Sequence, residues 1–262
     1  MNETEQKPSE KLMSIVEPFD VVAVGAHPDD VEIACGGTLA RLVELGYRVA
    51  IIDLTDGEPT PHSSAPEVRL EEARQAAETL GVQLRKVLAL PNRRLMDCFE
   101  ARVLLAAEFR RLRPRLVIGF GEKTPMASPD HWQAMQITDA AIFYSRLTKW
   151  DEHFCGLPPH TVERHLYFRL ALDADQWMDC GHPLTCDISM TLEKKVAAIR
   201  CYQTQFGHKS YIFDRVRAAA IVAGMAAGMN AGETFVAVRP LASYDLMATV
   251  LPETKQRYNL GK

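Results

Sequence analysis

The chain has 262 residues, of which 47% are hydrophobic and 24% charged, enough apolar material for one large domain. Its net charge of −4, with lysine and arginine scattered along the sequence, argues against nucleic acid or a membrane surface as a partner. No apolar run has the length of a secretory signal or of a transmembrane helix. With six cysteines and no C-x-x-C pair we expect a cytoplasmic protein with reduced thiols, although a Cys180–Cys186 bridge stays open.

Strand and helix patterns alternate after a polar tail at residues 1–18. Apolar, β-branched runs predict strands at Phe19–Gly25, Arg48–Leu54, Val87–Leu90 and Leu116–Phe120. Helical patterns occupy residues 36–45, Glu67–Leu80, Phe99–Leu112 and Ala134–Arg146. Strands separated by helices of this length form right-handed crossovers. The sequence therefore predicts an α/β fold, with a Rossmann-like, mostly parallel sheet and helices on both faces, over residues 19–150.

The pattern is weaker in the C-terminal part, residues 151–262, which we expect to be a smaller, irregular and helical portion. An irregular stretch at Asp151–Asp187 contains one strand at Leu166–Leu172. Helices at Thr191–Gln205 and Phe213–Met229 and an edge strand at Glu233–Val238 follow. We expect this part to complete the pocket of a single domain spanning residues 19–262.

Polar side chains follow two strands of the predicted sheet, at the point where each strand ends. His27, Asp29 and Asp30 come directly after the first strand, and Asp130 and His131 follow the fourth strand across a short loop. The carboxyl ends of parallel strands share one edge of a sheet, which is where α/β folds bind ligands. Two imidazoles and one carboxylate, with a position left for water, form the ligand set of a catalytic zinc site, and ferrous iron or another divalent transition metal is possible.

Each of these residues alone also has a purely structural explanation. A single histidine after a strand is more often a capping or core residue, and adjacent aspartates in a turn often bond to their own backbone. The joint occurrence at two strand ends favours a metal site with His27, Asp30 and His131 as ligands. Asp130 is then expected to fix the orientation of a ligand from behind.

The motifs also resemble a known family. Ala26-His27-Pro28-Asp29-Asp30-Val31-Glu32, then Gly36-Gly37-Thr38, and Pro129-Asp130-His131 a hundred residues later, are similar to the LmbE-like (PIG-L type) zinc deacetylases. The segment Arg69-Leu70-Glu71-Glu72-Ala73 looks like the Arg-x-x-Glu-Ala helix of that family. The resemblance covers residues 19–146 well and the remainder loosely, and it implies a Rossmann-like fold.

Carried over by position, the resemblance implies roles for several residues. His27, Asp30 and His131 would bind one Zn²⁺, Asp29 would act as the general base, and Arg69 would contact the sugar or its acidic aglycone. The implied reaction removes the N-acetyl group from an N-acetylglucosamine-containing small-molecule conjugate and releases acetate and a free amine. Asp53-Leu54-Thr55 and residues 137–141 are similar to the bacillithiol-pathway glucosaminyl-malate deacetylases, and a homo-oligomer is possible as in relatives.

Ser128 departs from the pattern of the family. Many relatives carry a histidine two residues before the aspartate of Pro-Asp-His, and it helps to stabilise or protonate the transition state. Ser128 is expected to donate to the substrate at this position, and the alternatives are another group such as His182 or an Asp29 that handles both proton transfers. Asn92, in the loop after the third strand, is a candidate for binding a sugar hydroxyl, and a plain turn role is equally compatible with the sequence.

Other functions remain open at this point. A metal hydrolase of another amide, carbamoyl or ester bond would use the same ligands, and a degenerate relative would bind metal without catalysis. A nucleotide-binding Rossmann domain would need a G-x-G-x-x-G turn after the first strand. The chain instead has Gly25-Ala26-His27-Pro28-Asp29-Asp30, whose two carboxylates would repel a pyrophosphate.

Overall fold

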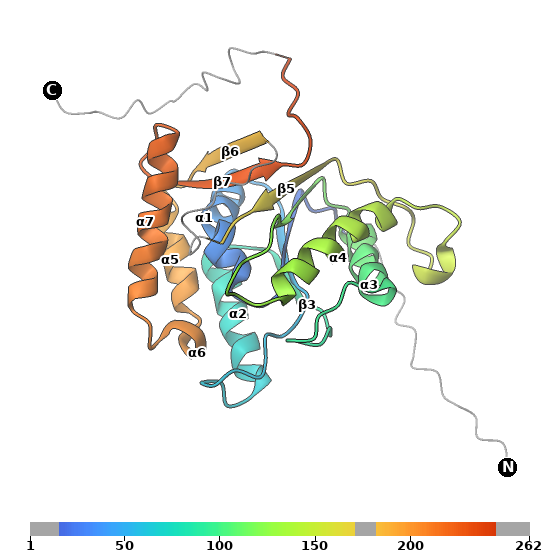
Figure 1. Cartoon of the computed structure of the whole chain (residues 1–262). Helices are drawn as coiled ribbons and strands as arrows, with labels where there is room; N and C mark the ends of the chain where they lie inside the picture. The colour runs from blue at the N-terminus through green and yellow to red at the C-terminus, as the bar shows by residue number, and fades with distance from the viewer. Residues whose placement is uncertain (1–15, 171–181, 245–262) are drawn as a thin grey trace.

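Seven strands form one sheet in the computed structural model, which describes residues 16–170 and 182–244 (Figure 1). Their order across the sheet is β3-β2-β1-β4-β5-β7-β6. The strands are β1 (Val21–Gly25), β2 (Val49–Asp53), β3 (Leu84–Val87), β4 (Leu116–Phe120), β5 (Arg164–Phe168), β6 (His182–Asp187) and β7 (Gly232–Ala237). Strands β1 to β5 are mutually parallel, whereas β7 runs antiparallel to both of its neighbours, β5 and β6.

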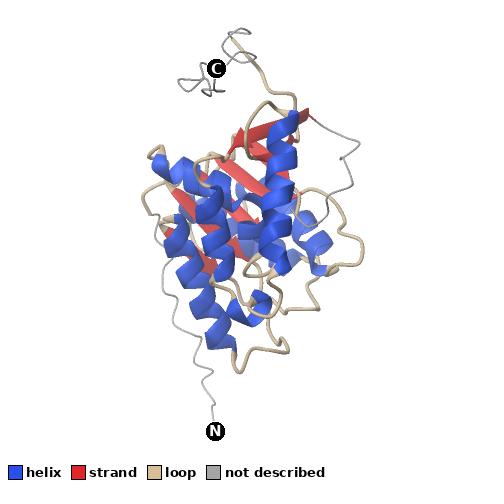
Figure 2. Ribbon diagram, turned by 90° about the vertical axis from the view of Figure 1, so that its left-hand side faces the viewer, coloured by secondary structure: helices blue, strands red, loops and turns tan. Residues whose placement is uncertain are grey.

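Helices cover both faces of the sheet (Figures 1 and 2). They are α1 (Asp30–Glu44), α2 (Pro66–Leu80), α3 (Phe99–Leu112), α4 (Asp130–Ser145), α5 (Leu192–Arg200), α6 (Gln203–Phe206) and α7 (Tyr211–Ala226), with a short 3₁₀ turn at Asp151–His153. Helices α3 and α4 pack against each other on one side, while α1, α2 and α5 pack together on the other and α7 lies against β7. The predicted α/β fold with a mostly parallel sheet is confirmed.

The two central strands explain why polar chemistry gathers at their ends. Every residue of β1 and of β2 is buried, because helices cover the sheet on both sides. The chain leaves β1 toward β2 and β3 and later crosses back to β4 on the other side of β1. The crevice where the strand order reverses therefore lies between the carboxyl ends of β1 and β4.

The third strand lies three residues earlier than the sequence predicted. Strand β3 is Leu84–Val87 and not Val87–Leu90, and it pairs with β2 from Ala50 to Asp53. The sequence pattern did not indicate this strand, because a half-buried strand normally alternates apolar and polar residues and here two basic residues are adjacent. Arg85 turns inward to Asp53, and the ammonium group of Lys86 reaches Glu108 on α3.

Helix α1 begins six residues earlier than predicted and is broken near the expected start. It starts at Asp30, and Cys35 leaves the helical conformation with φ −141°. The backbone N–H groups of Gly37 and Thr38 then donate to the carboxylate of Glu233 on β7, at 3.0 and 2.7 Å. The glycines therefore mark the point where an interrupted helix starts again. Its first N–H groups have no partner within the helix, and the carboxylate of Glu233 caps them.

The C-terminal part contains one more strand than expected. Strand β7 lies inside the sheet, and β6, from the stretch expected to be irregular, forms the edge. Pro183 argued against a strand here, since proline lacks the N–H that the hydrogen-bond ladder of a sheet needs and is tolerated only at an edge. The helix expected at Thr191–Gln205 is split into α5 and α6 around Cys201 and Tyr202. Cys186 carries a free thiol, and Cys180 lies outside the described residues.

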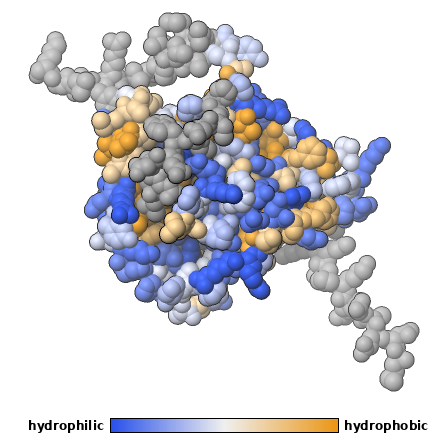
Figure 3. All heavy atoms as spheres, viewed as in Figure 1, coloured by the Kyte–Doolittle hydropathy of each residue, from blue (hydrophilic) through white to orange (hydrophobic). Residues whose placement is uncertain are grey.

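The outer face of α7 carries exposed apolar side chains. Ile221, Val222 and Met225 are exposed on α7, and hydrophobic surface gathers over the upper end of this helix in Figure 3. Of the surface expected at residues 241–250, Leu241 is exposed, and the residues from 245 onward lie outside the described part. In the part of the chain that the structure describes, no helix is long and apolar enough to cross a membrane.

Candidate metal centre

Three side chains of metal-ligand type converge at the crevice between β1 and β4. His27 and Asp30 come from the turn that joins β1 to α1, and His131 lies in the first turn of α4. Each offers one ligand atom, and these atoms lie within 4.8 Å of one another. All three residues are nearly inaccessible to solvent, at 9%, 4% and 5% exposure. A buried group of two imidazoles and one carboxylate suits a divalent transition metal.

The turn after β1 aims one carboxylate oxygen of Asp30 into this group. Its Oδ2 accepts the backbone N–H groups of Ala26 and His27 at 3.0 and 2.9 Å. The turn closes with Asp29 in a left-handed conformation, at φ 113°, directly before α1. Because the backbone holds Oδ2, the other oxygen, Oδ1, is left to face His131, whose Nε2 lies 3.4 Å away.

Each imidazole is held through the nitrogen that faces away from the group. His27 Nε2 lies 3.2 Å from Oδ2 of Asp130, and His131 Nδ1 lies 2.7 Å from the hydroxyl of Thr124. His27 Nδ1 and His131 Nε2 are left to point at Asp30, each 3.4 Å from one of its oxygens. Metal-binding histidines in proteins are oriented in this way through their second nitrogen. The residues present therefore fit a metal ion.

Two further contacts fix this arrangement. The Asp130 carboxylate also accepts the backbone N–H of Arg93 at 2.7 Å, so the loop after β3 anchors the residue that orients His27. The ring of His131 stacks on Phe120, the last residue of β4, with 4.6 Å between the ring centroids. The group is thus held by residues from three of the strand-end loops.

Proton affinities in the group are strongly perturbed. Burial lowers the pKa of the His27 imidazole, but the carboxylates of Asp30 and Asp130 outweigh burial and raise this pKa to about 10. Burial favours the neutral form of Asp30, yet the imidazoles of His131 and His27 hold its pKa well below its usual range. The buried carboxylate thus attracts positive charge, which either protons or a metal ion can provide.

Asp29 lies beside the group and is oriented by an arginine. Its Oδ2 accepts a hydrogen bond from Nη2 of Arg69 at 3.1 Å, and the same guanidinium nitrogen donates to the carbonyl of Pro28 at 2.6 Å. Burial raises the pKa of Asp29 to about 7, although Arg69 opposes this rise. A carboxylate that titrates near neutrality is suited to both accepting and returning a proton.

Arg69 is enclosed by the loop that follows β2. It is 3% exposed, and Oε1 of Glu58 lies 3.9 Å from its Nη1. Gly57, at φ +74°, passes so close that a Cβ there would lie 2.9 Å from the guanidinium. Nη2 of Arg69 thus holds the Asp29 carboxylate and the Pro28 carbonyl, whereas its buried Nε has no hydrogen-bond partner among the described residues. Its expected contact with substrate stays a prediction.

Asn92 and Ser128, the other expected substrate contacts, also have partners within the protein. The side-chain amide of Asn92 donates to the carbonyl of Glu58 at 2.9 Å and so joins the loops after β2 and β3. The hydroxyl oxygen of Ser128 accepts the backbone N–H of Asp130 at 3.2 Å, at the start of α4. Its own proton is not used in that bond. The backbone of His182 lies in β6, and its side chain lies outside the described residues.

Sequence reasoning missed three residues of the site. Thr124 holds His131, Phe120 stacks on it, and Glu58 lies beside Arg69. The sequence could have indicated Phe120, because this residue ends a predicted strand at the edge of the sheet that carries the site. Thr124 and Glu58 lie in loops whose path no local pattern predicts.

A second buried cluster lies on the other side of the β1–α1 turn. It consists of Glu32, Asp53, Arg85 and Tyr202 and is called here the Arg85 network. The Arg85 guanidinium donates to both oxygens of Asp53, at 2.7 and 2.9 Å, and to Oε1 of Glu32. The Tyr202 hydroxyl donates to the same Glu32 oxygen at 2.9 Å. These contacts link α1, β2, β3 and the segment before α6.

Comparison with known proteins agrees with this arrangement. Residues 22–142 match the family model described as PIG-L, GlcNAc-PI de-N-acetylase. The diacetylchitobiose deacetylase of Thermococcus kodakarensis is 30% identical over 206 residues, which cover 73% of this chain and 73% of that protein. The chain belongs to the PIG-L family. The matched region contains all three candidate ligands.

Other relatives of this PIG-L family member differ in their chemistry. The 4-oxalmesaconate hydratase of Pseudomonas putida is 27% identical over 229 residues, covering 81% of this chain and 83% of that protein. Among solved structures, the conserved protein TT1542 from Thermus thermophilus superimposes with a TM-score of 0.74 at 31% identity. That likeness covers 87% of this chain and 98% of the other. The relatives of this chain thus include proteins named as deacetylases and proteins named as hydratases.

Proposed function

We propose that this PIG-L family member is a zinc-dependent deacetylase of a small N-acetylglucosamine-containing conjugate, from which it releases acetate and a free amine. One observation carries the proposal. His27 Nδ1, His131 Nε2 and the Asp30 carboxylate converge, while the other nitrogen of each imidazole and Oδ2 of Asp30 are bonded to the protein. The deacetylases among its relatives support the reaction class.

These three residues would hold the metal through the atoms that point inward. When bound, the metal supplies a Lewis acid that polarises an amide carbonyl and lowers the pKa of water. Nitrogen and carboxylate ligands favour zinc, and ferrous iron is the alternative that the same ligand set accepts. Asp130 would keep His27 in the tautomer that presents Nδ1.

Asp29 would transfer the protons of the reaction. Its carboxylate is adjacent in sequence to the ligand Asp30, and Arg69 holds it from the far side. It would take a proton from the attacking water and return that proton to the departing amine. Since Arg69 donates to the Asp29 carboxylate, we propose that it sets the direction of this group.

Substrate contacts follow from the loops at the same edge. Ser128 would donate its free hydroxyl proton to the oxygen that becomes negative in the transition state. A hydroxyl stabilises that charge less than an imidazolium, so Ser128 affects the rate more than the type of reaction. Asn92 and the surrounding loop would face the sugar hydroxyls.

A second candidate function is the addition of water to a carbon–carbon double bond. It is favoured by the relative that is named as a hydratase and that matches 81% of this chain. Hydration would use the same ligands but release no acetate. Hydrolysis of another amide, carbamoyl or ester bond would release a different acid.

The test is acetate release by zinc-loaded protein from N-acetylglucosamine and from N,N′-diacetylchitobiose. We expect release in step with the appearance of a free amine, and none from protein stripped of metal. Asp29→Asn is the matched variant, because it keeps the shape of the side chain and removes its basicity. If metal-loaded protein releases no acetate from either compound but hydrates an unsaturated dicarboxylic acid, the hydratase function replaces the proposal.

A further inference from the structure

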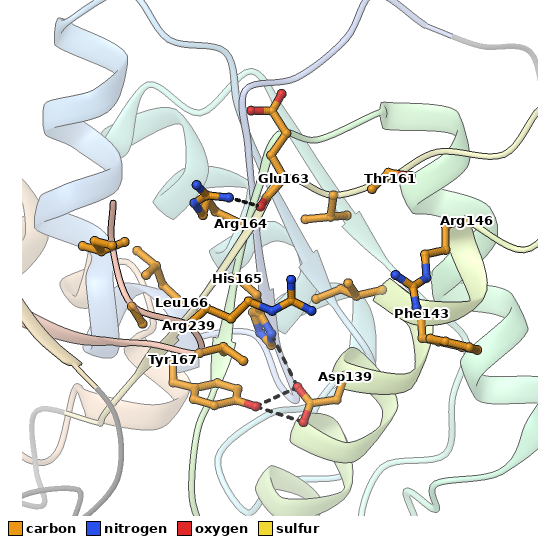
Figure 4. A pocket seen from close by; sticks show the side chains of 15 residues that line it. Asp139, Phe143, Arg146, Thr161, Glu163, Arg164, His165, Leu166, Tyr167 and Arg239 are labelled. Atoms are coloured by element: carbon orange, nitrogen blue, oxygen red, sulfur yellow. Dashed lines mark hydrogen bonds and ion pairs between the residues drawn. The ribbon is translucent and has the colours of Figure 1, made fainter. Parts of the chain in front are cut away.

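A cavity of about 430 Å³ lies between α4, the start of β5 and the end of β7 (Figure 4). None of the metal-centre residues lines it. Its walls include Thr161 to Tyr167, which lead into β5, and Ala237 to Arg239 at the end of β7, so it lies toward the amino end of β5. The metal centre follows the carboxyl ends of β1 and β4, and the cavity is therefore a separate site. Its volume falls within the range of roughly 300–1,000 Å³ for pockets that bind small molecules.

Two arginines define one side of this cavity. The side chains of Arg239 and Arg146 extend toward each other, from the end of β7 and from the end of α4 (Figure 4). Among residues 16–170 and 182–244 neither guanidinium has an ion-pair partner, and Arg146 instead lies over the ring of Phe143. The nearby carboxylate of Glu163 is already paired with Arg115, at 3.0 Å. Two like charges that face each other without a counter-ion favour an anion between them, and guanidinium groups match carboxylates.

The opposite side of the cavity carries polar groups without a positive charge. Both carboxylate oxygens of Asp139 accept the hydroxyl of Tyr167, at 3.0 and 3.1 Å, and His165 Nδ1 lies 3.5 Å from Oδ1. Burial lowers the pKa of His165 to about 4, so its ring is neutral near pH 7. Its Nε2 is buried and has no hydrogen-bond partner among the described residues. This side repels a second anion and accepts hydrogen bonds from neutral donors such as hydroxyl groups.

The cavity also has apolar side chains in its lining, namely Ile142, Val162, Leu166, Val238, Leu241 and the half-exposed ring of Phe143. A ligand that fits all three surfaces has a negative group at one end, a hydrocarbon body and hydroxyl groups at the other end.

We propose that this cavity is a second binding site, which takes a small hydroxylated carboxylic acid. The carboxylate binds between Arg146 and Arg239, and a hydroxyl group donates to Asp139. The site does not depend on the proposed deacetylation, because it shares no residue with the metal centre.

Quinate, a hydroxylated ring with one carboxylate, is the probe for this site. Two matched compounds each lack one feature: myo-inositol has no carboxylate and cyclohexanecarboxylate has no hydroxyl groups. Titration of the metal-loaded full chain, followed by calorimetry and by amide NMR shifts, should give a dissociation constant of about 1 mM for quinate. We expect at least tenfold weaker binding of the two matched compounds, with the shifts at residues that line the cavity.

The double variant Arg146→Gln with Arg239→Gln should weaken quinate binding at least tenfold. The control is the paired substitution Arg41→Gln with Arg74→Gln, which also removes two positive charges, but from exposed residues that do not line the cavity. Both arginines of the double variant are exposed, and its melting temperature verifies that it folds. Three results would overturn the proposal: no binding of quinate, equal binding by the double variant, or equal binding of myo-inositol. A change in oligomeric state of the double variant with unchanged quinate binding would identify the surface as a contact between copies instead.

Discussion

The metal centre and the Arg85 network are both buried clusters of charged groups, and Glu32 of the network lies two residues after the candidate ligand Asp30. In the Arg85 network the protein supplies its own cation. All three guanidinium nitrogens of Arg85 are bonded, to Asp53, Glu32 and the carbonyl of Ala73. At the metal centre, His27 Nδ1 and His131 Nε2 each lie 3.4 Å from a different oxygen of the Asp30 carboxylate.

Whether the protein supplies the cation distinguishes a cluster that stabilises the fold from one that is arranged to bind an ion. In the network, a side-chain cation stands at the centre of the acceptors. In the metal centre, Asp130, Thr124 and the backbone hold the three ligands from behind, and in front the two imidazoles face only the Asp30 carboxylate. Acceptors that are held from behind and converge in front are arranged for a cation that the chain itself does not contain.

The largest effect is expected from Asp30→Ala, which removes the carboxylate at the middle of the metal centre. Without it, only two imidazoles remain, and we expect loss of the metal and with it of all measurable turnover. Metal content after dialysis, measured by mass spectrometry, tests this. The control is Glu71→Gln, which removes a carboxylate from the exposed face of α2. Zinc retained at one ion per chain in Asp30→Ala would refute the assignment of this ligand.

Asp29→Asn should leave metal binding intact and lower kcat by about 10²–10⁴-fold, the usual contribution of a general base. The amide keeps the shape of the side chain and can still contact Arg69. Steady-state kinetics on protein with verified metal content measure the change. A variant with unchanged kcat would show that another group moves the proton.

Arg85→Met should destabilise the fold strongly while sparing the metal ligands. It leaves the buried carboxylates of Glu32 and Asp53 without their cation, and breaking a buried pair in this way costs about 3–5 kcal/mol of unfolding free energy. Urea denaturation measures the loss. Arg74→Met, in exposed pairs with Glu71 and Glu78, is the control and should be without measurable effect. Equal stability of the two variants would mean that the network is not structural.

Asp130→Asn should weaken metal binding by about 10–100-fold without abolishing it, because Asp130 acts through His27. The amide is too poor an acceptor to hold the imidazole in one tautomer. Competition with a chelator of known affinity gives the change. A loss as complete as that of Asp30→Ala would mean that Asp130 is itself a ligand.

The smallest effect is a change in the pH dependence of stability at the second cavity. Burial raises the pKa of Asp139 from 3.8 to about 6, so the folded state keeps a proton that the unfolded state has lost, and Asp139 lowers stability as the pH rises through this range. His165 has the opposite sign, because its pKa falls from 6.5 to about 4 and its contribution to stability is lost as the pH falls. In the wild type, the effects of Asp139 and His165 on the change of unfolding free energy with pH therefore oppose each other. In Asp139→Asn the unfolding free energy should therefore rise more steeply between about pH 4 and about pH 6, and an unchanged slope would show that Asp139 titrates normally.

The sequence predicted the parts of the molecule whose causes are local. Phe99–Leu112 and Leu116–Phe120 have the predicted bounds because an amphipathic run ends before Pro114 and an apolar run follows it. The edge of the sheet that carries the site was predictable for the same reason, since motifs at two strand ends must meet there. Long-range contacts caused the errors. The strand Leu84–Val87 contains Arg85 and Lys86, whose partners lie on other elements, and the break in α1 is capped by Glu233, about 200 residues further along the chain.

The most direct test of the central claim is an X-ray absorption spectrum and a crystal structure of the zinc-loaded protein. We predict one zinc ion bound by His27 Nδ1, Asp30 Oδ1 and His131 Nε2 at about 2.0–2.2 Å, with the fourth position left to solvent. Zinc bound at other side chains, or with four protein ligands and no open position, would contradict the account.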